Sequence, residues 1–186
     1  MRLKLVVCLV FALLFTGCKN TSAPLEQAVS LRNKLLESNG CTFSATVTAD
    51  YGDAVYSFSM DCMADKGGNV RFSVTQPETI AGITGEISEN GGSLTFDDKV
   101  LAFPMLADGE ISPVTCPWLF LKTLRGGYMR SCTDSGSSYQ IEIDDSYEED
   151  ALRLLISVED NLPVSGEVFW NGRRAMTIVV ENFIYL

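Results

Sequence analysis

The sequence CTFSATVTADYGDAVYSFSMDC occupies residues 41–62 and carries the clearest local pattern in the chain. Apolar residues alternate with polar ones on both sides of Tyr51-Gly52. A period of two is typical of a β-strand with one buried and one wet face, because successive side chains point to opposite faces. Two such runs around a short polar turn predict an antiparallel hairpin. The rest of the domain therefore has to supply partners for an amphipathic sheet.

The N-terminus has the features of a bacterial export signal. MRLK (residues 1–4) supplies two cations, and the apolar run from Leu5 to Phe15 follows. That run is shorter than the roughly 20 residues that a spanning helix needs. The end of the run, FTGC (residues 15–18), resembles the lipobox of bacterial lipoproteins, although its first position departs from the usual leucine. The resemblance implies cleavage before Cys18 and acylation of that residue, and it makes 1–17 a signal peptide and 18–24 a tether. A plain secretory signal that happens to contain a cysteine is the alternative.

Four cysteines remain in the exported domain after Cys8 in the signal and Cys18 are set aside. An even number in an exported chain favours structural disulfides. A two-residue turn at Tyr51-Gly52 places Asp50 opposite Asp53 and pairs apolar with apolar residues along the hairpin. The pairs are Val47 with Tyr56, Ala45 with Phe58, Phe43 with Met60, and Cys41 with Cys62.

This register predicts a cross-strand disulfide between Cys41 and Cys62. Counted from the turn, the two residues form a non-hydrogen-bonded pair, where the Cα atoms approach to about 4.5 Å. A disulfide fits that separation. Cys116 and Cys132 are then the natural second pair. In a reducing habitat all four would instead be thiols that act as small buried apolar groups.

Composition and charge restrict the function more than they define it. The chain is 46% hydrophobic and 20% charged, as expected of a folded domain. Removal of residues 1–17 leaves 12 basic and 24 acidic residues and a net charge of −12, which should repel nucleic acid. Histidine is absent, so the commonest general base, metal ligand and nucleophile partner are missing. We therefore expect a protein that is not an enzyme and has no catalytic residue, metal site or cofactor.

The remaining pattern predicts one α+β domain over residues 25–186. A helix from Leu25 should bury Leu25, Ala28, Val29, Leu35 and Leu36 and end at Asn39-Gly40. Alternating strands are expected near 70–75, 83–87, 93–96, 100–103, 128–133, 139–143, 152–158, 164–170 and 175–180, with two-residue turn chemistry at Asn171-Gly172. Between them, Ser112-Pro113 should cap a helix that is apolar on nearly all sides. A short helix of this kind must be buried, lie in a groove or cover an opening.

Glycines in the middle strands predict a place where the sheet can bend. If Ser88 faces Ser93 across the turn at Asn90-Gly91-Gly92, Phe96 lies opposite Gly85 and covers its bare backbone.

The order of elements resembles the lipoprotein-carrier superfamily of LolA and LolB. The likeness rests on the hairpin at 41–62, on NVRFSV (residues 69–74) before Pro77, on GGSLTFD (residues 91–97), and on the closing stretch from Asn161-Leu162-Pro163 through Asn171-Gly172-Arg173 to Asn182. The middle helix is shorter and richer in aromatic residues than in the family, and the cysteines are additional. The resemblance implies a curved, unclosed, half-barrel-like antiparallel sheet with helices covering its concave apolar face.

The same resemblance implies a gap between sheet and helices that accepts an acyl chain or another apolar ligand. Two helices also cannot cover the whole apolar face of such a sheet, so some of that face should line a cavity or an opening. The residues expected to line it are Phe43, Val47, Tyr56, Phe58, Met60, Phe72, Leu94, Phe96, Trp118 and Phe120. The alternative is that these residues form a dry core.

Two functions are compatible with the sequence. The first is a lipoprotein that is anchored to the membrane through Cys18 and binds or carries an apolar ligand. The second is an interaction or regulatory module of the cell envelope with a closed core, whose partner is another envelope protein. Both place the protein on the extracytoplasmic face of a bacterial membrane.

Overall fold

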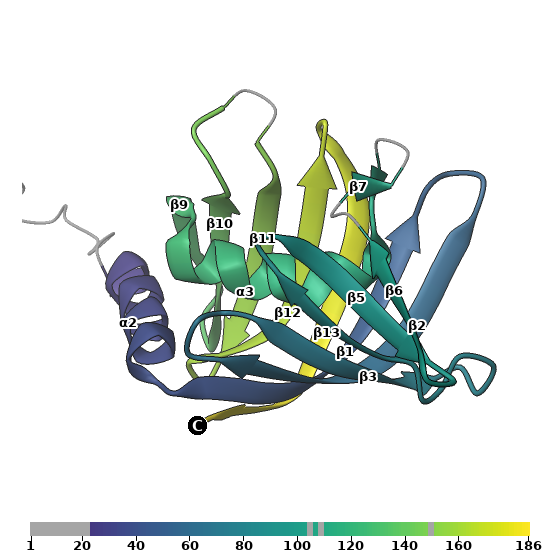
Figure 1. The fold of residues 1–186 in the computed structure, drawn as a ribbon. Coiled ribbons are helices and arrows are strands. Elements are labelled where there is room, and N and C mark those ends of the chain that lie inside the picture. The colour runs from purple at the N-terminus through teal and green to yellow at the C-terminus, as the bar shows by residue number, and fades with distance from the viewer. Residues whose placement is uncertain (1–22, 104–105, 108–109, 149–150) are drawn as a thin grey trace, which may run out of the picture.

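The computed structural model describes residues 23–103, 106–107, 110–148 and 151–186. Its main element is an unclosed antiparallel sheet of eleven strands, in the order β6-β5-β4-β3-β2-β1-β13-β12-β11-β10-β9 (Figure 1). Two α-helices and a single 3-10 turn accompany it in the described ranges. The expected α+β architecture, a curved open sheet with covering helices, is therefore confirmed. The signal peptide and Cys18 lie outside the described residues.

The helical elements are α2 (Ala23–Glu37), η1 (Pro113–Thr115) and α3 (Cys116–Gly126). The strands of the large sheet are β1 (Gly40–Asp50), β2 (Val55–Asp65), β3 (Val70–Gln76), β4 (Thr84–Ser88), β5 (Gly91–Phe96), β6 (Lys99–Phe103), β9 (Tyr128–Asp134), β10 (Ser138–Asp144), β11 (Arg153–Glu159), β12 (Leu162–Trp170) and β13 (Arg173–Tyr185). A separate two-stranded sheet consists of β7 (Leu106–Ala107) and β8 (Glu110–Ile111).

The sheet consists of two meanders that meet at the first and last strands. β1 pairs with β13 from Cys41 opposite Tyr185 to Ala49 opposite Met176. This pairing joins residues more than 120 positions apart in sequence, so no local pattern predicts it. The predicted turn at Asn171-Gly172 is confirmed, because Trp170 lies opposite Arg173 and both turn residues have positive φ.

The first hairpin has the predicted faces but not the predicted register. Its turn is longer than two residues: the Tyr51 N–H donates to the Ala54 carbonyl, and Asp50 lies opposite Val55. Every pair is shifted by two positions, so Cys41 lies opposite Ala64, and Cys62 lies opposite Phe43. A shift of two keeps every side chain on its own face. The prediction that Cys41 faces Cys62 is therefore wrong, and all four cysteines of the described domain are free thiols in this structure.

The second hairpin shows the same kind of shift. Ser88 lies opposite Gly91, so Leu94, and not Phe96, is the partner of Gly85. Aromatic rings do cover the bare glycines, but they come from other strands. The Phe72 ring lies where a Cβ of Gly85 would be, and the Phe103 ring occupies the corresponding place over Gly92.

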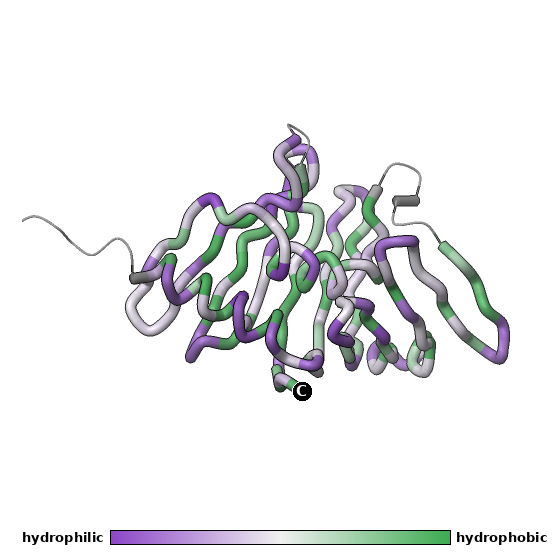
Figure 2. Tube along the Cα trace, turned by 60° about the vertical axis from the view of Figure 1, so that its left-hand side comes forward, coloured by the Kyte–Doolittle hydropathy of each residue, from purple (hydrophilic) through white to green (hydrophobic). Residues whose placement is uncertain are grey.

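Helix α3 fills the concave face of the sheet (Figure 1). Its apolar side chains are buried against those of the strands, and Figure 2 shows hydropathy alternating along several of the strands. Of the three placements expected for the middle helix, the structure shows the buried one. The buried side chains of α3 are Cys116, Pro117, Trp118, Leu119, Phe120, Leu121, Thr123 and Leu124.

The start of this helix differs from the expectation. The η1 turn precedes α3, and the Ser112 side chain makes no capping hydrogen bond. The Ser112 carbonyl instead accepts a hydrogen bond from Thr115 Oγ1 at 2.6 Å. Pro113, which favours helical φ, begins the 3-10 turn. The Ser112 carbonyl also accepts a hydrogen bond from the Thr115 N–H.

Helix α2 packs against α3 and the edge strand β9. It begins at Ala23, two residues before the expected start. Its buried stripe contains Ala28, Leu31 and Leu35, whereas the predicted members Leu25, Val29 and Leu36 are exposed. Three of the five predicted positions are therefore wrong, because α2 covers an edge of the sheet and contacts it along a narrow line.

The packing of α3 on the sheet predicts a steric test at Gly166 on β12. A Cβ at this position would lie 2.8 Å from Phe120 Cε2 and 3.2 Å from Ile178 Cγ2. We expect Gly166→Ala to lower the free energy of unfolding by about 1–3 kcal/mol, the usual cost of overpacking a core. Gly126→Ala is the matched control, because nothing lies within 4 Å of its Cβ position. Urea unfolding of both variants measures the difference, and equal stability of the two would contradict this packing.

Candidate functional site

The predicted interior site is occupied by the protein's own side chains. Seven of the ten residues expected to line a cavity are at most 8% exposed: Phe43, Val47, Phe58, Met60, Phe72, Trp118 and Phe120. A side chain that lined a ligand-sized cavity would keep accessible surface, because water-sized spheres fit into such a space. These seven residues therefore belong to a packed core.

The other three predicted residues lie at the margins of that core. Tyr56 is exposed beside the turn of the first hairpin, where the centroid of its ring lies 6.1 Å from that of the Tyr51 ring. Leu94 is half-buried, and Phe96 at the end of the same strand is exposed. The ten residues are thus not brought together around one space.

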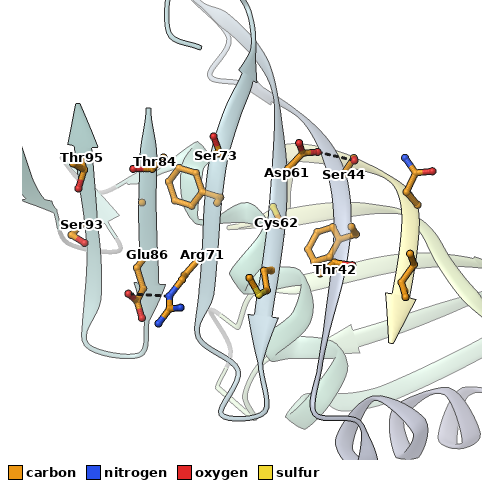
Figure 3. Close-up of a pocket in the computed structure, with 16 residues that line it drawn as sticks. Thr42, Ser44, Asp61, Cys62, Arg71, Ser73, Thr84, Glu86, Ser93 and Thr95 are labelled. Atoms are coloured by element: carbon orange, nitrogen blue, oxygen red, sulfur yellow. Dashed lines mark hydrogen bonds and ion pairs between the residues drawn. The ribbon is translucent and has the colours of Figure 1, made fainter. Parts of the chain in front are cut away.

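A broad hollow lies on the outer face of the sheet. It measures about 760 Å³ and crosses β13, β1, β2, β3, β4 and β5 (Figure 3). Ten of its sixteen lining residues are polar, because the side chains with the wet parity of their strands face it. The other six are Phe43, Cys62, Met63, Phe72, Gly85 and Ile184, so two of the predicted cavity residues border this outer hollow. The polar lining residues are Thr42, Ser44, Asp61, Arg71, Ser73, Thr84, Glu86, Ser93, Thr95 and Asn182.

Several polar groups of this outer groove are already bonded to one another. Ser44 Oγ donates to Asp61 Oδ1 at 2.9 Å, and Arg71 Nε lies 3.6 Å from Glu86 Oε2 (Figure 3). The Arg71–Glu86 pair is exposed on both sides, and such surface pairs contribute little to stability. The groove can offer hydroxyl and carboxylate hydrogen bonds to a polar partner, but it is open and shallow for a small ligand.

One buried carboxylate stands out on the other half of the sheet. Asp144 is 5% exposed and receives hydrogen bonds from Arg153 Nε to Oδ1 and Arg130 Nη1 to Oδ2, each at 2.8 Å. The two guanidinium groups hold the pKa of Asp144 below its usual value, and the hydrogen bond from Arg153 has the larger effect. The carboxylate therefore stays charged and paired, and it links β9, β10 and β11 instead of serving as a proton acceptor.

Sequence reasoning missed Arg32, which joins the two helices. Its Nε donates to the Leu124 carbonyl and its Nη2 to the Gly127 carbonyl, each at 2.7 Å. Both acceptors are at the C-terminal end of α3, where carbonyl groups lack partners within the helix. A basic residue among exposed positions of α2 gave no signal of this role, because its partners lie more than 90 residues away.

The thiols of the core are placed for packing and not for reaction. Cys41 and Cys62 point inward from β1 and β2, and Cys116 begins α3. Burial raises the pKa of Cys41 and Cys116 to about 12 and also raises the pKa of Cys62. Cys132 lies on β9 with its Sγ 3.2 Å from the Pro24 carbonyl oxygen of α2. Since only the thiolate is a strong nucleophile, the three buried thiols should be inert in the folded protein.

Exposed apolar side chains gather on the hairpin formed by β5 and β6. Val100 is 70% exposed and Leu101 65% exposed, and Phe96 next to the turn is also exposed. Leu94 and Phe103 are half-buried beside them. This hairpin lies at the end of the sheet opposite to β9.

Neither helix of the described residues is long and apolar enough to cross a membrane. Within the same ranges, no group of three or more Cys, Asp and Glu side chains is arranged to hold a metal ion.

Comparison with known proteins gives likeness in fold alone. No protein-family model matches the chain, and no curated protein sequence matches it. A LolA superfamily protein from Nitrosomonas europaea is 9% identical, with 84% of this chain and 92% of that chain covered and a TM-score of 0.44. A putative outer membrane lipoprotein-sorting protein domain from Vibrio parahaemolyticus is 8% identical, with 89% and 93% covered and a TM-score of 0.49.

A third similar structure is that of the CwlD amidase from Clostridioides difficile in complex with the GerS lipoprotein. The matching chain is 16% identical, with 91% of this chain and 100% of that chain covered and a TM-score of 0.43. The structural neighbours thus include LolA superfamily and lipoprotein structures at low sequence identity, as the sequence resemblance led us to expect.

The burial of the cysteines predicts the order in which they react. In residues 19–186, which contain only the four domain cysteines, iodoacetamide should modify Cys132 first, since it alone is partly accessible. The other three should react only after unfolding in urea, where their pKa returns to its ordinary value. Peptide mapping of the modified chain measures the order. Cysteines that stay unmodified in urea until a reductant is added would show disulfides and contradict the free thiols.

Proposed function

We propose that the protein is a lipid-anchored binding module on the extracytoplasmic face of a bacterial membrane. Its partner is another protein of the envelope, and it acts by binding and not by catalysis. The observation that carries this proposal is the packed interior: the side chains expected to hold an apolar ligand are buried against α3. Carriage of an acyl chain in that space would require α3 to leave the sheet.

The composition supports binding without catalysis. The chain has no histidine, and its buried carboxylate Asp144 is held by two arginines. Three apolar side chains on β5 and β6, Phe96, Val100 and Leu101, are exposed, so another protein can reach them.

The N-terminal sequence supports anchoring close to the bilayer. Four residues, 19–22, separate the proposed acylation site Cys18 from Ala23, the first residue of α2. The five steps from Cys18 to Ala23 span at most about 18 Å, because each step adds at most about 3.6 Å. A partner of this domain would therefore be a membrane protein or a protein held near the membrane.

Anchoring is tested by replacing the proposed acylation site. We expect Cys18→Ser to move the protein from the membrane fraction to the soluble fraction, or to leave residues 1–17 uncut and shift the gel mobility upward. Cys132→Ser is the matched control, because this thiol is in the folded domain and should not affect localisation. Unchanged mobility together with an unchanged membrane fraction for Cys18→Ser would contradict the anchor.

The nature of the partner is tested by cross-linking on intact cells. An amine-reactive reagent can use Lys34, Lys66, Lys99 and Lys122, which are exposed on different elements and turns. We expect a discrete protein adduct, whereas solvent extraction of the purified protein should release no non-covalent lipid. Near-stoichiometric lipid in the extract and no protein adduct would contradict the proposal and favour a carrier of apolar ligands.

A further inference from the structure

The two edges of the open sheet differ in what lies beside them. The edge strand β9 is covered by α2, whose Pro24 carbonyl accepts a hydrogen bond from Cys132 of that strand. At the other end of the sheet, β6 pairs with β5 on one side, and no strand of the described residues pairs with its other side. An edge strand presents unpaired N–H and C=O groups at alternate residues, which makes it a template for another strand.

The side chains of β6 lack the features that usually protect an edge. Charged residues, proline or a bulge within the strand would discourage pairing. In β6 only Lys99 is charged, the register with β5 is regular, and the following four residues are all apolar. Leu101 and Phe103 share the concave face with Leu94, and Val100 and Ala102 lie on the outer face. Figure 2 shows this strand as the outermost one at the right of the sheet.

The charge around this edge selects the chemistry of an added strand. Residues 84–103 carry four acids, Glu86, Glu89, Asp97 and Asp98, and one base, Lys99. Beside β6, a hollow of about 550 Å³ is lined by Glu86, Ser88, Asn90, Ser93 and the bare backbone of Gly91 and Gly92. A lysine or arginine of an added strand could reach the Glu86 carboxylate across this hollow.

We propose that β6 receives an extended segment of the partner protein as a twelfth strand. The segment has alternating apolar residues, which pack beside Leu101 and Phe103, and basic residues, which face the acidic outer rim. This assignment rests on the proposed function as a protein-binding module and names the surface and the kind of partner that it uses. A second copy of the chain is a poor occupant, because two mature chains of charge −12 repel each other.

A synthetic peptide tests the assignment on the full mature chain carrying Cys18→Ser. The probe is Lys-Val-Lys-Val-Thr-Val-Lys, and its binding is followed by fluorescence anisotropy and amide hydrogen exchange. We expect binding together with slowed exchange of residues 99–103. An acidic version with glutamate in place of each lysine should bind at least tenfold more weakly. A version with proline in place of the central valine should also bind at least tenfold more weakly, since proline lacks the N–H that donates a hydrogen bond to the neighbouring strand.

Matched substitutions localise the effect. Val100→Lys and Leu101→Lys should each weaken binding at least tenfold, because they remove apolar contact and add a like charge. Val55→Lys is the control, since Val55 is 63% exposed on β2 and away from this edge. Hydrogen exchange of the core strands should stay the same in all three variants, which shows that each has folded.

Four outcomes would overturn the assignment. They are unchanged exchange at residues 99–103, equal binding of the proline peptide, equal losses from Val55→Lys and Val100→Lys, and a dimer of the unsubstituted chain that Val100→Lys dissociates. A protein adduct that persists in cells carrying Val100→Lys would overturn this edge alone and leave the proposed function standing. If the unsubstituted chain formed no protein adduct in cells, that result would instead contradict the proposed function.

Discussion

The position of α3 in the concave face of the sheet is the constraint on which the rest of the structure depends. A one-sided sheet of eleven strands exposes a broad apolar face, and this helix covers it with side chains that are almost entirely buried. Burial of each large apolar side chain contributes about 1.5–3 kcal/mol, so the sheet and helix stabilise each other. The close fit requires Gly166, whose missing side chain makes room for the Phe120 ring. Arg32 then fixes the end of α3 and ties α2 to the same core.

The parity of the strands could be predicted from the sequence, but their register could not. The period-two pattern at 41–62 correctly assigned inward and outward residues, because a wrong parity would expose a whole apolar face. A slip of two positions leaves that pattern unchanged, so the length of the turn alone decides the register. Tyr51 to Ala54 form a longer turn than expected, and the same ambiguity displaced the partner of Gly85. The disulfide prediction failed because it depended on register, which was its weakest premise.

A different ambiguity limited the prediction of the candidate site. Phe43, Phe58 and Phe120 were correctly placed on the inner face, yet inward apolar residues look the same in a dry core and in a lined cavity. Only the packing of α3 separates the two, and it depends on contacts between distant segments. β6 could be recognised from the sequence as a strand, but its place at an edge of the sheet follows from the non-local pairing of β1 with β13. The proposal that binding uses the surface of the sheet therefore rests on the structure, since the sequence alone left the choice open.

The central claim is that the interior is filled by protein and that binding takes place at the surface. Methyl NMR with a spin-labelled fatty acid tests it most directly, because the label broadens signals from nearby methyl groups. The account predicts no broadening of Ile141, Leu154, Ile156 and Leu121, which are at most 1% exposed, at fatty acid concentrations below micelle formation. Selective, saturable broadening of these core methyl groups would show that a ligand enters between α3 and the sheet, and it would contradict the account.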